Sequence, residues 1–412
     1  MNFLLSLSLK NLWRYRRRTF ITAFAIAAGI MLFIWMDSFL LGIEKESERS
    51  TVLYETGAAQ IMDSEYYQNI QYMPLKYVIK DPDPLLASLE KLKVPATKRV
   101  SFSGEIFYGG NSQPLKMYAI DMDSYGKVFK LDSILTEGGS FIEKGKNEIL
   151  LGEEMAKDLN IPLGGSIDIR TKTRTGISQT LTLTVTGFIN SLNVNMNAGA
   201  GIIPLEIANR DLEMNGAVTE IALAIPEYRN IYKEVKKISS ELGGEMNGKE
   251  IHTWDDMGGQ IVKIMGGKRK AIFVLLFLLG VIAAVGISNT MLIAVFERIK
   301  EIGMMRAMGM ADKQIRTAFI LEAGWIGLIG SLMGVVLGIG LNAYTIYVGL
   351  DYGMILDKID IGINIPSVFH GAWNIETIIA APIIGVVIST FVALFPAKRA
   401  LRMDITECLR HQ

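Results

Sequence analysis

Residues 297–310 read Glu297-Arg298-Ile299-Lys300-Glu301-Ile302-Gly303-Met304-Met305-Arg306-Ala307-Met308-Gly309-Met310, a polar stretch between two long apolar runs. Ile299, Ile302, Met305 and Gly309 recur near the helical period, which predicts one apolar face, and charged residues cover the rest. Gly309 is placed like the residue that ends a helix, and Asp312 like the N-cap of the next one. We therefore expect a short amphipathic helix between two membrane spans, able to bind a soluble partner.

Composition indicates a membrane protein with a sizeable soluble part. Half of the 412 residues are hydrophobic and the mean hydropathy is +0.29, which is too apolar for an ordinary soluble protein and too polar for a chain wholly in the membrane. The net charge of zero gives no sign of nucleic-acid binding. Cys408 is the single cysteine, and His252, His370 and His411 lack metal-ligand spacing, so we expect neither an intrachain disulfide nor a metal site.

Apolar runs divide the chain into four expected membrane spans, since a span needs about 20 apolar residues. We expect a membrane protein with four transmembrane helices and a large α+β extracytoplasmic domain between helices 1 and 2. Its segments are an amphipathic helix at 1–18, spans at 19–42, 271–296, 317–348 and 374–396, the outer domain at 43–270, the polar loop at 297–316, a short outer loop at 349–373 and a tail at 397–412.

The first two segments each leave an alternative open. The basic residues of 1–18 fit the positive flank of the first span as well as a helix lying on the membrane surface. Ala23-Phe24-Ala25 looks like a signal-peptide cleavage site, but the apolar run continues well past it. We therefore interpret 19–42 as an uncleaved anchor.

The outer domain shows both strand and helix patterns. Residues 166–170 and 180–186 alternate like strands, whereas 84–92, 153–159 and 227–242 have helical spacing. Glycine pairs at 109–110, 138–139 and 164–165 predict turns. Residues 243–249 nearly spell a phosphate-binding loop, but Glu250 stands where Ser or Thr would hold Mg²⁺. We expect no nucleotide-hydrolysis site in this chain.

Counts of Lys and Arg predict the orientation. The N-terminal segment carries five, the 297–316 loop five and the tail four, while the 349–373 loop carries only Lys358. Because cytoplasmic loops are enriched in these residues, we expect both termini and the polar loop in the cytoplasm and the large domain outside. Lys268-Arg269-Lys270 breaks the pattern, but charges attached to a long translocated domain weigh less.

A ridge of small residues marks the third span. Gly330, Gly334 and Gly338 lie four residues apart and predict close packing on another span. The second span has small residues at the same spacing: Gly280, Ala284 and Ser288. Ordinary span packing and the transmission of motion both fit this ridge.

Two acids fall within or at the edge of expected spans. Asp37 lies near the outer end of the first span, and Glu322 six residues after Arg316. Intramembrane acids are functional candidates, although Asp37 could also reach the outer interface and Glu322 the cytoplasmic one. The chain shows no nucleophile–base arrangement, so we expect no catalytic residues and no enzyme.

Three motifs resemble those of the permease subunits of four-span ABC transporters, which include lipoprotein-releasing, macrolide-exporter and cell-division permeases. The stretch 297–309 is similar to that superfamily's coupling helix, and 395–400 with Asp404, Glu407 and Leu409 to its C-terminal signature. Residues 147–153, followed by 163–164 and 185–188, resemble its extracytoplasmic domain. This last motif and residues 57–61 favour the lipoprotein-releasing branch.

The resemblance implies that ATP hydrolysis and transport are carried out by different chains. A cytoplasmic ABC ATPase dimer would bind ATP and Mg²⁺, so this chain would hold no cofactor, and would dock on the coupling helix. A second permease, identical or homologous, would complete the transporter in the bacterial inner membrane. The residues implied in ATPase coupling are Glu297, Arg298, Ile299, Glu301, Ile302, Met305, Arg306 and Gly309.

The lipoprotein-releasing branch further implies extraction of lipoproteins from the inner membrane toward a periplasmic carrier. By position, acyl chains would enter a cavity formed by Met36, Phe39, Leu40, Ile43, Ile261, Ile264, Ile272 and Leu275. The main alternative is macrolide-exporter-type efflux or peptide export by transmembrane mechanical coupling. A membrane-anchored enzyme lacks a catalytic constellation here, and a sensor lacks a cytoplasmic signalling domain.

Overall fold

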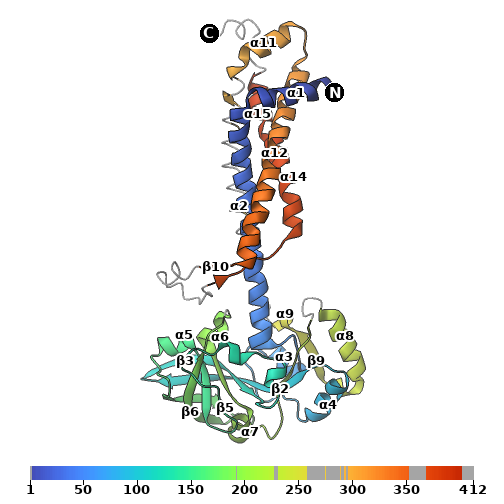
Figure 1. The fold of residues 1–412 in the computed structure, drawn as a ribbon. Coiled ribbons are helices and arrows are strands. Elements are labelled where there is room, and N and C mark those ends of the chain that lie inside the picture. Colours follow the sequence, from blue (N-terminus) through green and yellow to red (C-terminus); the bar gives the residue numbers. More distant parts are fainter. Residues whose placement is uncertain are drawn as a thin grey trace. The chain divides into compact units, whose positions relative to one another are not determined.

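The structure, a computed structural model, describes residues 2–191, 193–226, 231–257, 296–351 and 368–400, with positions 274, 288, 292 and 293. Contacts divide the chain into two compact units. We call residues 1–45, 265–353 and 367–412 the membrane unit, and residues 46–264 and 354–366 the outer unit. Figure 1 labels their elements.

Helices make up most of the described part of the membrane unit. They are α1 (Asn2–Arg14), α2 (Arg16–Ser50), α11 (Ile299–Ala307), α12 (Asp312–Tyr347), α14 (Ile375–Val392) and α15 (Leu394–Ala400), and the end of α2 after residue 45 belongs to the outer unit. A two-stranded pair joins β10 (Leu350–Asp351) to β11 (Val368–Phe369). Three described helical stretches, Arg16–Thr56, Asp312–Tyr347 and Ile375–Arg399, are long and apolar enough to cross a membrane. The expected second span, 271–296, lies mostly outside the described residues.

The glycine ridge of α12 packs on α2. A Cβ added at Gly334 would lie 2.7 Å from the Ala27 carbonyl oxygen and 2.7 Å from Ile30 Cβ. Gly330 and Gly338 approach α2 in the same way. The ridge thus lies against the first span, while Gly280 and Ala284 of the expected second span lie outside the described residues. Small residues at the same spacing indicate only that a helix can be approached closely, and not which helix approaches it.

A neighbouring side of α12 packs on α14, again through small residues. Gly327 of α12 faces Ser389 of α14, and Gly385 of α14 faces Ser331 of α12. Both serines are buried. Within the membrane unit α12 therefore packs on both α2 and α14, the helices that flank it in Figure 1, and both contacts need small side chains.

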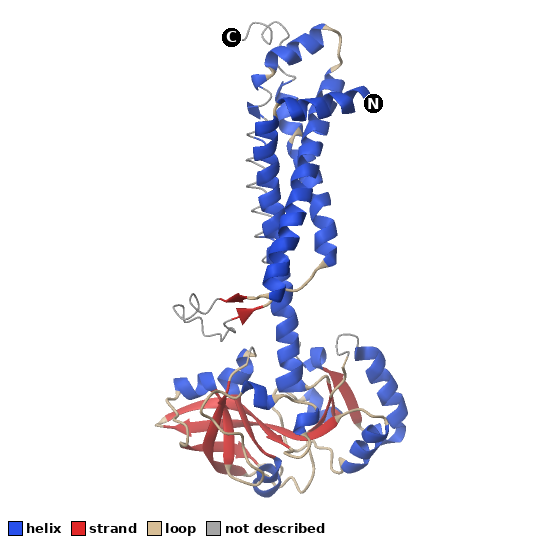
Figure 2. Ribbon diagram, viewed as in Figure 1, coloured by secondary structure: helices blue, strands red, loops and turns tan. Residues whose placement is uncertain are grey.

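The outer unit is built on a nine-stranded sheet in the order β3-β7-β4-β6-β5-β2-β8-β1-β9 (Figure 2). Since β2 also pairs with β3, the strands from β3 to β2 in this order close into a ring, and β8, β1 and β9 extend from β2. The strands are β1 (Ala59–Asp63), β2 (Ala96–Tyr108), β3 (Asn111–Ile120), β4 (Glu148–Gly152), β5 (Ser166–Lys172), β6 (Ser178–Ile189), β7 (Ala200–Pro204), β8 (Glu220–Leu223) and β9 (Lys249–Thr253).

The long strand β2 joins the two parts of this sheet. Residues 96–99 pair with β8 and residues 105–107 with β5, while residues 99–108 form a hairpin with β3. Gly109 and Gly110 at the hairpin turn have φ values of 57° and 84°. A two-residue turn of this kind needs positive φ at both positions, which explains the predicted glycine pair.

Short helices complete the outer unit. They are α3 (Ser64–Gln68), α4 (Asp83–Lys91), α5 (Glu153–Asp158), α6 (Val194–Gly199), α7 (Leu205–Asp211), α8 (Ile231–Leu242) and α9 (Trp254–Met257), with a π-helical turn η1 (Thr51–Thr56) directly after α2. The helices predicted at 84–92 and 153–159 and the strands predicted at 166–170 and 180–186 are confirmed. Helix α8 covers the described part of the pattern at 227–242.

Candidate functional site

Helix α11 occupies the polar stretch between the two apolar runs and ends where the sequence predicts. Gly309 has a φ of 90°, a conformation that favours glycine. The Met310 N–H donates to the Met305 carbonyl oxygen over 3.0 Å, and the Gly309 N–H to that of Arg306 over 3.0 Å. These are the two hydrogen bonds of a Schellman cap. The helix therefore ends sharply and turns into α12.

The next helix begins differently from the prediction. Asp312 is the first residue of α12 and does not act as its N-cap. Instead, the backbone N–H of Ala311 donates to Gln314 Oε1 over 3.0 Å. The Asp312 carboxylate is used elsewhere, because its Oδ1 lies 3.1 Å from Arg306 Nε. An ion pair with α11 thus replaces the expected cap.

The apolar face of α11 turns toward the chain itself. Ile299 and Ile302 are 4% and 0% exposed, and Met305 is half-buried. Ile302 belongs to an apolar cluster with residues of α12 and α15: Ile315, Phe319 and Ala397. The expectation that these side chains contact a partner is corrected, because an apolar face predicts burial without saying which chain covers it.

The exposed face of α11 consists of Lys300, Met304, Ala307 and Met308, here called the α11 outer face. Met304 is 53% exposed and Met308 is 77% exposed. Methionine is flexible and polarisable, which suits it to surfaces that adapt to a partner. The α11 outer face is therefore the part of this helix that is open to another chain.

The predicted charged residues of this region separate into two groups. Glu297 and Glu301 remain partly exposed, and Glu301 Oε1 lies 3.1 Å from Arg14 Nη2 of α1. Arg298 is buried, and its Nη1 lies 3.0 Å from Glu322 Oε2. The structure thus places Arg298 inside the membrane unit, and Glu322 has a cationic partner as an intramembrane acid requires.

The predicted substrate cavity is only partly described. Its first-span residues lie on α2 and are half-buried: Met36, Phe39, Leu40 and Ile43. Its other residues lie outside the described part of the chain: Ile261, Ile264, Ile272 and Leu275. Asp37 on the same turn accepts a hydrogen bond from Asn374 Nδ2 over 2.8 Å, so this acid joins α2 to the residue that caps α14.

A buried polar network holds η1 to the sheet of the outer unit. Arg99 of β2 pairs with Glu220 of β8 and donates from Nη1 to the Glu55 carbonyl oxygen over 2.6 Å. Ser101 Oγ donates to Glu220 Oε1 over 2.7 Å, and the Tyr118 hydroxyl to Glu55 Oε1 over 3.3 Å. Burial raises the pKa of Tyr118, and the neighbouring Glu55 carboxylate raises it further. Sequence reasoning missed this network, because its members are spread over four segments.

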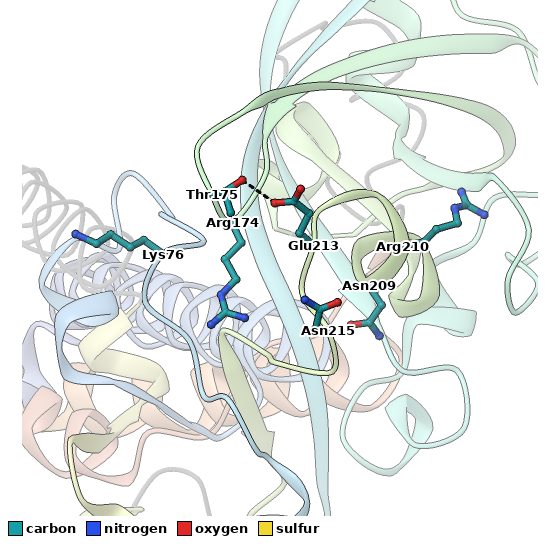
Figure 3. Close-up of a pocket in the computed structure, with 7 residues that line it drawn as sticks. All are labelled: Lys76, Arg174, Thr175, Asn209, Arg210, Glu213 and Asn215. Carbon is teal, nitrogen blue, oxygen red and sulfur yellow. Dashed lines mark hydrogen bonds between the residues drawn. The ribbon is translucent and has the colours of Figure 1, made fainter.

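An open cavity of 680 Å³ lies in the outer unit (Figure 3). Its lining is polar: Lys76, Arg174, Thr175, Asn209, Arg210, Glu213 and Asn215. Thr175 donates to Glu213 over 2.6 Å, while Arg210 pairs with Asp211 over 2.8 Å. Figure 3 shows Lys76 and Arg210 pointing away from Arg174 in opposite directions. The three cations do not converge on one point, so the cavity carries no ligand assignment.

Comparisons with known proteins cover nearly the whole chain. Residues 19–236 match the family described as MacB-like periplasmic core domain, and residues 273–405 the family described as FtsX-like permease C-terminal. An uncharacterized ABC transporter permease of Methanocaldococcus jannaschii is 22% identical over 99% of this chain and 97% of its own. LolC, a transmembrane protein of the lipoprotein-releasing system of Xylella fastidiosa, is 22% identical over 75% of this chain and 76% of its own. A macrolide export ATP-binding/permease protein MacB of Yersinia pestis is 31% identical over 32% of this chain and 17% of its own.

Proposed function

Because this chain belongs to the ABC transporter permeases of the LolC, MacB and FtsX type, we propose that it transmits the work of a separate cytoplasmic ATPase to lipoproteins in the inner membrane. The partner ATPase would hold ATP and Mg²⁺, and this permease would supply no catalytic group. A second permease, identical or homologous, would complete the transporter. Both termini and α11 would face the cytoplasm, as the Lys and Arg counts predict.

The exposure of Met304 and Met308 is the observation that carries the docking proposal. On the other side of their helix, Ile302 is buried against α12 and α15, so the α11 outer face belongs to a helix that is packed on the rest of the membrane unit. Adaptable apolar side chains at the centre and charged ones at the rim suit a protein interface. Here Lys300, Glu297 and Glu301 form that rim.

Charge substitution on the α11 outer face tests the docking. In a Met304→Asp/Met308→Asp variant, the new carboxylates would have to be dehydrated when the ATPase binds, and the apolar contacts of both methionines would be lost. Binding of the ATPase should therefore weaken by about 2 kcal/mol or more. The ATPase that co-purifies with the wild-type chain should then be lost. Ile177→Asp is a matched control, because Ile177 is a 61% exposed apolar side chain in the outer unit. Equal recovery of the ATPase with both variants contradicts the docking proposal.

Similarity to LolC over three quarters of the chain supports the lipoprotein substrate. Membranes reconstituted with the permease and its ATPase should release an acylated lipoprotein when ATP is added. The same protein without its acyl chains should not be released in an ATP-dependent way. Equal release of both forms contradicts the lipoprotein proposal.

The second candidate is macrolide-exporter-type efflux or peptide export, which the match to a MacB-like periplasmic core domain favours. The same reconstituted membranes distinguish the two. ATP-dependent transport of a macrolide or a peptide, with lipoproteins left in the membrane, would favour this candidate.

A further inference from the structure

Arg298 and Glu322 belong to a buried cluster with Tyr15 and Arg18, here called the α11 clamp. Glu322 Oε2 lies 3.0 Å from Arg298 Nη1, and Glu322 Oε1 lies 3.0 Å from Arg18 Nη2. The side chains of Arg298 and Glu322 are each 3% exposed, and that of Arg18 is 16% exposed. One carboxylate of α12 therefore bridges two guanidinium groups, one from α2 and one from the residue that precedes α11.

The ring of Tyr15 completes the clamp. The Arg298 guanidinium carbon lies 3.9 Å from the ring centroid and that of Arg18 lies 5.3 Å from it. Arg298 Nε and Nη2 are buried without a hydrogen-bond partner in the described part of the chain. An aromatic face attracts a cation that has lost its water, so the ring compensates in part for these missing bonds. Tyr15 lies between the end of α1 and the start of α2, so the clamp joins these two helix ends to the start of α11 and to α12.

A buried charge cluster of this kind fixes the orientation of the helices that it joins more than it adds to their stability. Replacing a buried ion pair by apolar residues often leaves stability unchanged, whereas removing one partner leaves a costly unpaired charge. Helix α11 has nine residues, too few to be stable alone, and the apolar contacts that hold it are non-directional. A charge bridge with two defined distances restricts the rotation of the helix further.

We infer that Glu322 is the positioning residue of α11: it holds that helix in one orientation relative to α2 and α12. Force applied to the α11 outer face then passes into these two helices instead of rotating α11 in place. The role in transport rests on the proposed function, whereas the predicted geometry does not depend on it.

The geometry can be measured without any partner. Spin labels on Ala307→Cys of α11 and Val336→Cys of α12, in a Cys408→Ser background, report the distance between two exposed positions. The parent chain should give one narrow distance distribution. Adding Glu322→Gln keeps the side-chain shape but leaves Arg18 and Arg298 to repel each other, so the distribution should broaden or split. Glu376→Gln, at an exposed acid in the first turn of α14, should keep the narrow peak.

A second measurement tests coupling. The Glu322→Gln chain should still bind the ATPase, because the α11 outer face is intact, but its stimulation of ATP hydrolysis should fall roughly tenfold, as small misplacements of a working group do. The melting temperature of the same sample monitors folding. If Glu322→Gln does not accumulate, Arg298→Lys serves, since it keeps the charge but loses the planar group that bridges Glu322 and stacks on Tyr15.

The outcomes separate this inference from the proposed function. A narrow, unshifted distance peak in the Glu322→Gln chain overturns the positioning role, and a broadened peak with unchanged stimulation overturns the role of this position in coupling. Failure of the wild-type chain to bind an ATPase overturns the proposed function, while the spin-label distances still decide whether Glu322 positions α11.

Discussion

Single buried charges connect elements at several places in this chain. Glu322 joins α12 to Arg298 and Arg18, and Glu220 of β8 joins Arg99 of β2. In each case the acid has its cation within the same unit and very little access to water. Removal of one partner from such a pair is costly, because the other charge stays buried and unpaired. These residues should therefore tolerate substitution far less than acids at the surface.

The Arg99–Glu220 pair gives a prediction for the outer unit. Glu220→Gln leaves the Arg99 guanidinium buried without a carboxylate, which should weaken the pairing of β2 and β8 by about 3 kcal/mol. Amide hydrogen exchange in residues 96–101 and 220–223 should then become roughly a hundredfold faster. Glu105→Gln, at a half-exposed acid of the same strand, should exchange near the wild-type rate. Equal protection of β2 in both variants contradicts this account of the network.

At the scale of elements, the packing of α12 depends on the absence of side chains. A Cβ at Gly334 would meet the Ala27 carbonyl oxygen, a backbone atom that cannot move aside without moving α2. Gly340 of the same helix has nothing within 4 Å of its Cβ position. Gly340 therefore has room for a larger side chain, whereas Gly334, six residues earlier in the same helix, does not.

This difference predicts unequal effects of one substitution. Gly334→Leu should separate α12 from α2 and destabilise the membrane unit by about 1–3 kcal/mol, the usual cost of overpacking. Gly340→Leu should have little effect, since leucine also favours a helix. The measurement is the melting temperature of each purified chain in the same detergent. Equal melting temperatures would rule out close packing through the glycine ridge.

Elements with a clear local period could be predicted from the sequence. Strand β5 was found because its side chains alternate, and the structure buries Ile167, Ile169 and Thr171 in that pattern. The end of α11 was found because Gly309 has one local role. The partner of the glycine ridge and the direction of the Ile302 face could not be found, because both depend on which distant segment packs there.

The α11 clamp shows the same limit more sharply. Arg18 and Glu322 are 304 positions apart, and no periodicity relates them. One signal was available: an acid inside an apolar run needs a cationic partner. That rule predicts that Glu322 has a cationic partner, but several arginines of the chain could have been that partner. Only the fold shows that Arg18 and Arg298 both pair with Glu322.

At the scale of the whole molecule, the proposed mechanism requires α11 and the outer unit to be reached from opposite sides of the membrane. Ala307→Cys and Lys172→Cys, each in a Cys408→Ser background, place single thiols at exposed positions of the two units. In intact cells a membrane-impermeant maleimide should label the Lys172→Cys chain and leave the Ala307→Cys chain unlabelled until the membrane is opened. Labelling of both chains in intact cells would contradict the predicted orientation.

The central claim is that an ATPase docks on the α11 outer face, and site-specific photocrosslinking tests it most directly. A photoreactive amino acid at Met308, which is 77% exposed, should capture the ABC ATPase in native membranes. The same group at Val336, 70% exposed on α12 within a candidate membrane span, is the control and should not capture it. An ATPase adduct formed through Met308 alone is the predicted result. No adduct through Met308, or equal adducts from both positions, would contradict the claim.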